Sequence, residues 1–112
     1  MDSRMTQHSS IVERVLSDYA AFLSGDDQVQ VELVFDREQG RYLLVEVGWE
    51  EGRRIYGTLL HIDLVGDKIW IQQDGTEDGV AEELVAAGVP KHQIVLGFKS
   101  PERRQLTEFA VS

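Results

Sequence analysis

The chain has 112 residues, a formal net charge of −9 and no cysteine. This length suits a single domain, and the lack of cysteine excludes disulfides and zinc–thiolate sites. The acidic balance argues against tight, direct binding to nucleic acid, which requires a basic face against the phosphates. No apolar run is long enough to span a bilayer. We therefore expect one cytoplasmic domain over residues 1–112, with no cofactor and no membrane contact.

A helix is predicted first. Apolar residues recur at spacings of three and four and form one stripe, made of Ile11, Val12, Val15, Leu16, Tyr19, Phe22 and Leu23. Ser10 and Glu13 have the spacing of a capping box that can start this helix, whereas Asp2 or Ser3 would start it earlier. Gly25-Asp26-Asp27 marks its end.

Four strands follow, because apolar and polar residues alternate with period two. The strands cover Val29 to Asp36, Tyr42 to Trp49, about Arg53 to Leu64, and Lys68 to Gln73. The connections between them are too short for a crossover between parallel strands, so an antiparallel meander is predicted. Packing in the core is the favoured role for Trp49 and Trp70. If either proves exposed on an apolar patch, it becomes the leading candidate for a partner anchor.

The rest of the chain predicts a second helix, a short strand and a brief last helix. Thr76 or Asp78 caps the second helix, and Gly88 ends it. Ile94 to Phe98 predicts a buried strand, and Ser100-Pro101 has the pattern of an N-cap and first turn. The predicted fold class is α+β: a four-stranded antiparallel meander plus a short C-terminal strand, with the helices packed on one face.

No sequence motif for nucleotide binding, nucleophilic catalysis or zinc hydrolysis is present. His61-Ile62-Asp63 is the most interesting local feature, since alternation places the imidazole and the carboxylate on one face of a strand. Asp74 and Glu77 follow the next strand and can add oxygen ligands, which defines the alternative of a metal-dependent or hydrolytic module centred on these four residues. A structural His61–Asp63 pair, with turn or cap roles for Asp74 and Glu77, is the favoured interpretation, so no metal site is assigned.

Two charged clusters complete the survey. Five carboxylates between Asp74 and Glu83 favour a solvated acidic helix face. Arg103 and Arg104, with Lys99 nearby, form the main C-terminal basic cluster; a solvated or ion-paired turn is favoured, and direct DNA contact is the alternative. The candidate partner-surface positions are therefore His61, Asp63, Asp74, Glu77, Arg103 and Arg104.

From Phe35 onward the chain resembles the XisI family, whose members are called fdxN-element excision controlling factors. The residues in the order and spacing of that family are Phe35-Asp36, Tyr42, Val47-Gly48-Trp49, His61-Ile62-Asp63, Lys68-Ile69-Trp70-Ile71-Gln72, Asp74-Gly75-Thr76-Glu77, Gly88-Val89-Pro90-Lys91, Ile94-Val95-Leu96-Gly97-Phe98, Pro101, Arg104, Thr107 and Phe109-Ala110-Val111. The resemblance covers nearly the whole chain. Gln93 departs from it, since the family often has an acidic residue there.

The resemblance implies an XisI-like accessory factor for programmed excision of a DNA element by site-specific recombination, during heterocyst differentiation in cyanobacteria. The implied partners are a companion protein, XisH, and a site-specific recombinase. The family offers no catalytic residues to carry over, so a non-enzymatic role through protein–protein interaction is expected. A homodimer through an exposed sheet edge is also compatible with the sequence.

Overall fold

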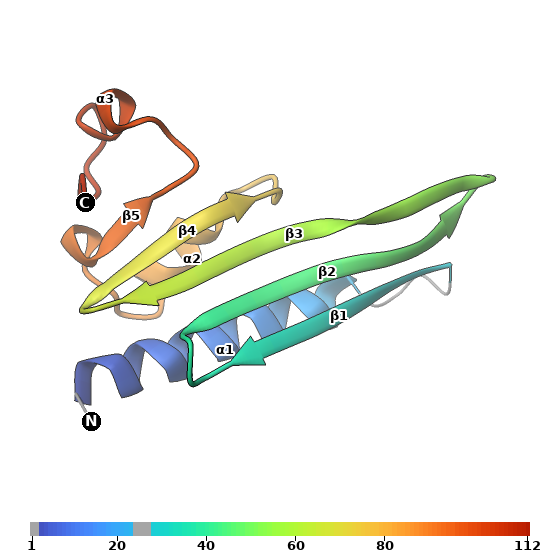
Figure 1. Ribbon diagram of the computed structural model, residues 1–112, viewed down its shortest axis with the longest axis horizontal. Coiled ribbons are helices and arrows are strands. Elements are labelled where there is room, and N and C mark those ends of the chain that lie inside the picture. The colour runs from blue at the N-terminus through green and yellow to red at the C-terminus, as the bar shows by residue number, and fades with distance from the viewer. Residues whose placement is uncertain (1–2, 24–27) are drawn as a thin grey trace.

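The computed structural model describes the backbone of residues 3–23 and 28–112, and the side chains of residues 7–23 and 28–112. The elements in chain order are α1 (Ser3–Leu23), β1 (Val29–Asp36), β2 (Arg41–Glu50), β3 (Arg53–Val65), β4 (Lys68–Asp74), α2 (Val80–Ala86), the 3₁₀ turn η1 (Lys91–Gln93), β5 (Ile94–Leu96) and α3 (Pro101–Arg104). The strands form one sheet in the order β1-β2-β3-β4-β5 (Figure 1). Neighbours are antiparallel from β1 to β4, and β5 joins β4 in parallel. The predicted α+β fold with a meander and a short fifth strand is confirmed.

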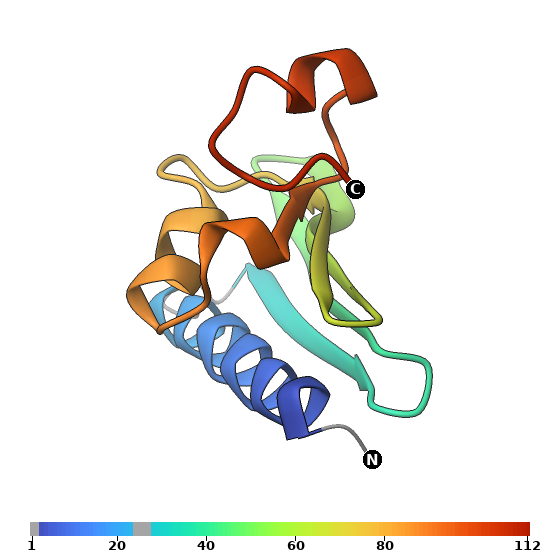
Figure 2. The same cartoon turned by 90° about the vertical axis from the view of Figure 1, so that its left-hand side faces the viewer.

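One face of the sheet is covered by α1 and α2 (Figure 2). The inward side chains of the three central strands are fully or almost fully buried against these helices, namely Tyr42, Leu44, Leu60, Ile62, Leu64, Ile69 and Ile71. Val12, Val15 and Leu16 of α1 and Val80 and Leu84 of α2 belong to the same core, together with Ala81, Val89, Ile94 and Leu96. Burial of each such aliphatic side chain contributes about 1.5–3 kcal/mol. None of the described helices is both long and apolar enough to cross a membrane.

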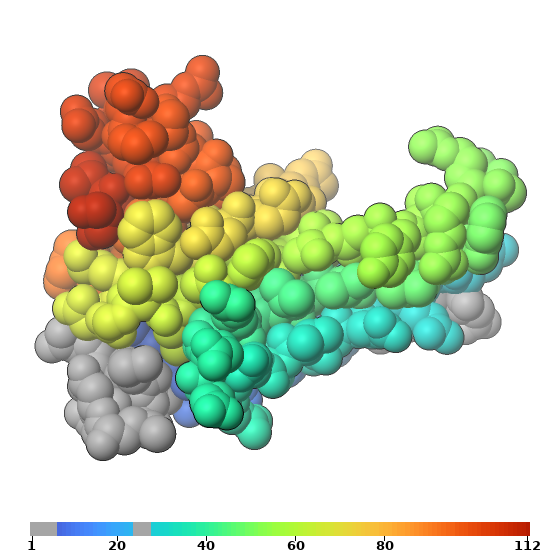
Figure 3. Space-filling model, viewed as in Figure 1, coloured from blue at the N-terminus to red at the C-terminus, as the bar shows by residue number. Residues whose placement is uncertain are grey.

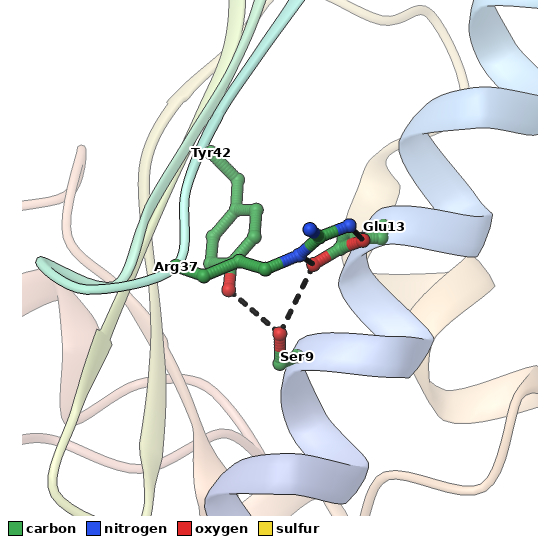
Figure 4. A network of polar contacts seen from close by, with 4 residues as sticks. All are labelled: Ser9, Glu13, Arg37 and Tyr42. Atoms are coloured by element: carbon green, nitrogen blue, oxygen red, sulfur yellow. Dashed lines mark hydrogen bonds and ion pairs between the residues drawn. The ribbon is translucent and has the colours of Figure 1, made fainter.

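The start of α1 follows the earlier of the two predicted positions. The helix begins at Ser3, so Ser10 lies inside it and the capping box at Ser10 is wrong. Asp2 and the predicted stop at residues 25–27 lie outside the described residues. Glu13 instead binds the β1–β2 turn, because its carboxylate accepts hydrogen bonds of 2.8 and 2.9 Å from Arg37 (Figure 4). These hydrogen bonds lower the pKa of Glu13 despite its partial burial.

Asp74, the last residue of β4, caps the N-terminus of α2 with its side chain. Its Oδ2 accepts a 2.8 Å hydrogen bond from the backbone N–H of Val80, and its Oδ1 accepts one of 2.9 Å from the N–H of Thr76. The predicted caps Thr76 and Asp78 are therefore replaced by a residue six positions before the helix. Gly88, with a φ of 109°, ends α2 as predicted, because glycine adopts this left-handed conformation without a Cβ clash.

The segment after β5 crosses to the other face of the sheet. β5 stops at Leu96, two residues earlier than predicted, because the N–H of Lys99 bonds back to the Leu96 carbonyl and turns the chain. Ser100 caps α3 as predicted, with its hydroxyl accepting from the N–H of Arg103. The Arg104 guanidinium then lies 5.1 Å from the centre of the Trp70 ring.

The β2–β3 hairpin is longer than the rest of the sheet. β4 pairs only with residues 60–65 of β3, so residues 53–58 pair with β2 alone. We call residues 45–58 the hairpin arm. A register shift after Leu44, opposite Leu59, marks the start of the arm. The arm projects beyond the C-terminal segment and gives the molecule its longest extent of 42 Å (Figures 1 and 3).

Candidate partner-docking surface

The hairpin arm carries exposed aromatic residues on the outer face of the sheet, the face opposite α1 and α2. Trp49 pairs with Arg54 and Val47 pairs with Tyr56, and paired residues of antiparallel strands share a face. Trp49 is 57% exposed and Tyr56 71% exposed. The prediction that Trp49 packs in the core is therefore wrong, because Trp49 faces away from the helices and lies beyond the part of the outer face that the C-terminal segment covers (Figure 1).

Arg54 joins these two aromatic side chains into one cluster. Its guanidinium carbon lies 5.5 Å from the Trp49 ring centre and 5.7 Å from the Tyr56 ring centre. Each exposed cation–π contact of this kind contributes about 0.5–1 kcal/mol, which restrains side chains that are otherwise in water. Trp, Tyr and Arg are also the residue types enriched at the energetic centres of protein interfaces. We call Trp49, Arg54 and Tyr56 the arm cluster.

Apolar residues continue the outer face from the arm cluster toward β1. Alternation along β2 places Leu43, Val45 and Val47 on this face, and Val34 of β1 pairs with Leu43. Val34 is 48% exposed, and the three β2 residues are half-buried. An apolar strip with an aromatic cluster at one end is typical of a macromolecular docking surface rather than of a catalytic cleft.

His61 and Asp63 lie on the same outer face, farther from the arm tip. His61 Nε2 is 2.8 Å from Asp63 Oδ1, and the Gln72 side-chain amide donates a 3.2 Å hydrogen bond to Asp63 Oδ2. Both side chains are partly buried, with exposures of 33% and 19%. The structure thus joins the histidine and the carboxylate in a local hydrogen-bonded group beside Trp70, which pairs with Asp63.

Asp74 and Glu77 do not join the His61–Asp63 pair. Asp74 pairs with Leu60, whose side chain points into the core. Both carboxylate oxygens of Asp74 accept hydrogen bonds from backbone N–H groups at or before the start of α2. Glu77 is exposed in the following loop. Among the described residues no group of three or more His, Cys, Asp or Glu side chains is arranged to hold a metal ion. The alternative of a metal-dependent or hydrolytic module at these four residues therefore loses its geometric basis.

Arg103 and Arg104 have different environments. The Arg104 side chain is partly buried, and its Nε donates to the carbonyls of Leu96 and Lys99 at 3.2 and 3.0 Å. Arg103 is exposed. The hydrogen bonds of Arg104 and its contact with Trp70 hold the C-terminal segment in place, whereas the exposed side chain of Arg103 is free of such a structural role in the described part of the chain; the partner-surface role of both arginines stays a prediction.

Two further sites were not distinguished by the sequence. His8 is 4% exposed, and its Nε2 is hydrogen-bonded to Gln93 Oε1 at 2.9 Å. Gln93, where the chain departs from the resembled family, therefore contacts the buried imidazole of His8. Phe22, predicted within the buried stripe, is 83% exposed and lines a groove between α1 and the start of α2.

Comparison with known proteins agrees with this architecture. The family model described as XisI protein matches residues 1–111. A solved XisI-like protein from Anabaena variabilis ATCC 29413 is 39% identical, with a TM-score of 0.89, and the match covers 96% of this chain and 99% of that chain. The solved fdxN element excision controlling factor XisI from the same organism is 31% identical, with a TM-score of 0.82 over 97% and 99% of the two chains. Curated proteins give no match.

The five-stranded mixed sheet, its two covering helices and its exposed arm define an α+β protein with the XisI-like fold. The chain belongs to the XisI protein family.

Proposed function

We propose that this chain is a non-enzymatic accessory factor in the programmed excision of a DNA element, and that it acts in the cytoplasm by docking onto a protein partner. The partner we propose is a companion protein of the XisH class, through which the chain controls a site-specific recombinase. The observation that carries the proposal is the arm cluster, an exposed Trp–Arg–Tyr group on a projecting hairpin. One relative is named an excision controlling factor, which is consistent with action on another macromolecule.

Charge supports a protein partner over DNA and over a second copy of the chain. The net charge of −9 opposes approach to phosphates and to an identical molecule. Arg104, one of the two arginines considered for DNA contact, is bound to backbone carbonyls. The apolar outer face needs no charge of its own to bind a partner, because burial of its aromatic and aliphatic side chains supplies the affinity.

The test is complex formation between the purified chain and an XisH-class protein, measured by size-exclusion chromatography and calorimetry. Trp49→Ala is expected to weaken binding by about 2 kcal/mol, roughly 30-fold, as for loss of an interface hot spot. Leu106→Ala is the matched control, since Leu106 is 86% exposed and belongs to the segment after α3, at the end of the molecule away from the tip of the hairpin arm (Figure 1).

Three results would contradict the proposal. Separate elution of the two proteins at micromolar concentration would contradict the proposed interaction with an XisH-class protein. Equal weakening by Trp49→Ala and Leu106→Ala would remove the arm cluster as the docking surface. A stable homodimer of the chain alone, abolished by Trp49→Ala, would assign the arm to a second copy instead.

A further inference from the structure

A groove separates the C-terminal half of α1 from the start of α2, on the helical side of the molecule. It has a volume of about 270 Å³ and is lined by Val15, Asp18, Tyr19, Phe22, Asp78 and Glu83. The four α1 residues follow the spacing i, i+3, i+4, i+7, so they form one continuous helix face. We call this feature the α1–α2 groove. It is separate from the arm cluster, which lies on the opposite face of the sheet.

The lining of the groove is apolar at its base and rim. Val15 is 6% exposed and forms part of the core, whereas Phe22 is 83% exposed. An aromatic side chain with this exposure contributes almost nothing to packing of the free chain, although it continues the same helix face as Val15. Tyr19 lies between them and is partly buried. A ligand that covers Phe22 would bury apolar surface that the fold itself leaves in water.

Three carboxylates surround this apolar surface: Asp18 on α1, Asp78 in the loop before α2, and Glu83 on α2. The ion pairs among the described side chains involve other carboxylates, namely Glu13, Asp63 and Glu108. The field of the acidic groups reaches the groove interior. Burial raises the pKa of Tyr19, and the negative charges of Glu83, Asp74 and Asp78 raise it further.

We propose that the α1–α2 groove binds a basic, amphipathic segment of a protein partner. The fit is one of charge and shape together. A lysine or arginine carries an aliphatic stem that can lie along the rings of Phe22 and Tyr19, while its cationic head meets the carboxylates of Asp18 and Glu83. Nucleic acid is repelled by the same carboxylates. The groove therefore adds a second docking surface to the proposed function, with a ligand chemistry different from that of the arm cluster.

The probe for this site is a fluorescein-labelled amphipathic helical peptide with leucine on one face and lysine on the other, used with the full chain. Phe22→Ala is expected to weaken peptide binding about tenfold, as for a moderate interface anchor. The double variant Asp18→Asn, Glu83→Gln is expected to weaken it by about the same factor at low salt and by less at high salt.

Matched controls separate groove binding from general attraction between a cationic peptide and an acidic protein. The double variant Glu38→Gln, Glu102→Gln removes the same number of charges from exposed positions outside the groove, and Leu106→Ala removes an exposed apolar side chain elsewhere. Both controls should change affinity less than about twofold. Amide shifts in the nuclear magnetic resonance spectrum should change at residues 15–22 and 78–84.

Equal weakening by the groove and control variants would overturn the proposal, as would amide shifts spread over the whole surface. A homodimer of the free chain that Phe22→Ala abolishes would also overturn it, because the groove would then be occupied by a second copy. Trp49→Ala should leave peptide binding unchanged, so failure of the groove proposal and failure of the arm proposal are separate results.

Discussion

Replacement of Asp74 by alanine is expected to destabilise the chain by about 2 kcal/mol. The Asp74 carboxylate accepts hydrogen bonds from the N–H of Val80, which starts α2, and from the N–H of Thr76. Val80 is fully buried, so its N–H has no access to water when the acceptor is removed. Loss of a helix cap costs about 0.5–2 kcal/mol, and an unsatisfied buried donor costs about 1–3 kcal/mol. The two estimates describe largely the same hydrogen bonds, and the value of about 2 kcal/mol lies where they overlap.

Urea unfolding followed by circular dichroism measures this loss. With a slope of about 2 kcal/mol per molar urea, the midpoint should fall by about 1 M. Asp74→Asn keeps one carbonyl acceptor and should lose about half as much. A change below about 0.5 kcal/mol for Asp74→Ala would refute the capping role. Chelator treatment of the unmodified chain should leave the midpoint unchanged; a fall that matches Asp74→Ala would instead indicate a metal at this carboxylate.

Two more predictions concern the contacts that hold α1 and the C-terminal segment. Because the Arg37 hydrogen bond lowers the pKa of Glu13 below its ordinary value of 4.5, the stabilisation is present above that value and is lost as pH falls through the folded-state pKa. The stability difference between the unmodified chain and Glu13→Gln should therefore shrink in urea titrations below about pH 4.5; a constant difference would contradict the ion pair. Arg104→Ala should destabilise the chain by about 1–3 kcal/mol, since it removes hydrogen bonds to four backbone carbonyls and the contact with Trp70. Arg103→Ala is the control and should change stability by less than about 0.5 kcal/mol in the same assay; equal effects would contradict the structural role of Arg104.

Local patterns predicted most elements of this fold. Period-two alternation with short turns predicted the antiparallel meander, because each turn leaves too few residues for a crossover. Gly88 and Ser100-Pro101 were recognisable because few residue types suit these positions: glycine is favoured at a left-handed helix end, and proline is favoured at the first position of a helix. These signals depend only on neighbours in the chain, so they needed no knowledge of tertiary packing.

The docking surface was not predictable in the same way. Alternation shows that Trp49 and Val47 share a face, but it does not show which face the helices cover or how far the C-terminal segment extends over the other face. Phe22 continues the apolar stripe of α1 beyond the last residue that the core covers. Asp74 caps a helix from six residues away, whereas the usual N-cap pattern concerns the residue next to the first turn. In each case the deciding quantity is the relative length or placement of two distant elements.

Because β4 is shorter than β3, the two halves of β3 differ in the number of strands to which they are hydrogen-bonded. Over residues 60–65, β3 has a hydrogen-bonded neighbour on both sides, but over residues 53–58 only β2 holds it. Every second amide of that outer stretch points away from β2, toward the position that β4 would occupy if it were longer. Those amides should exchange with solvent deuterium as fast as those of a peripheral strand, although β3 is the middle strand of the sheet. A single strand thus combines slow and rapid exchange, and the boundary between them lies at Leu59, where the backbone carbonyl accepts the hydrogen bond from Gly75.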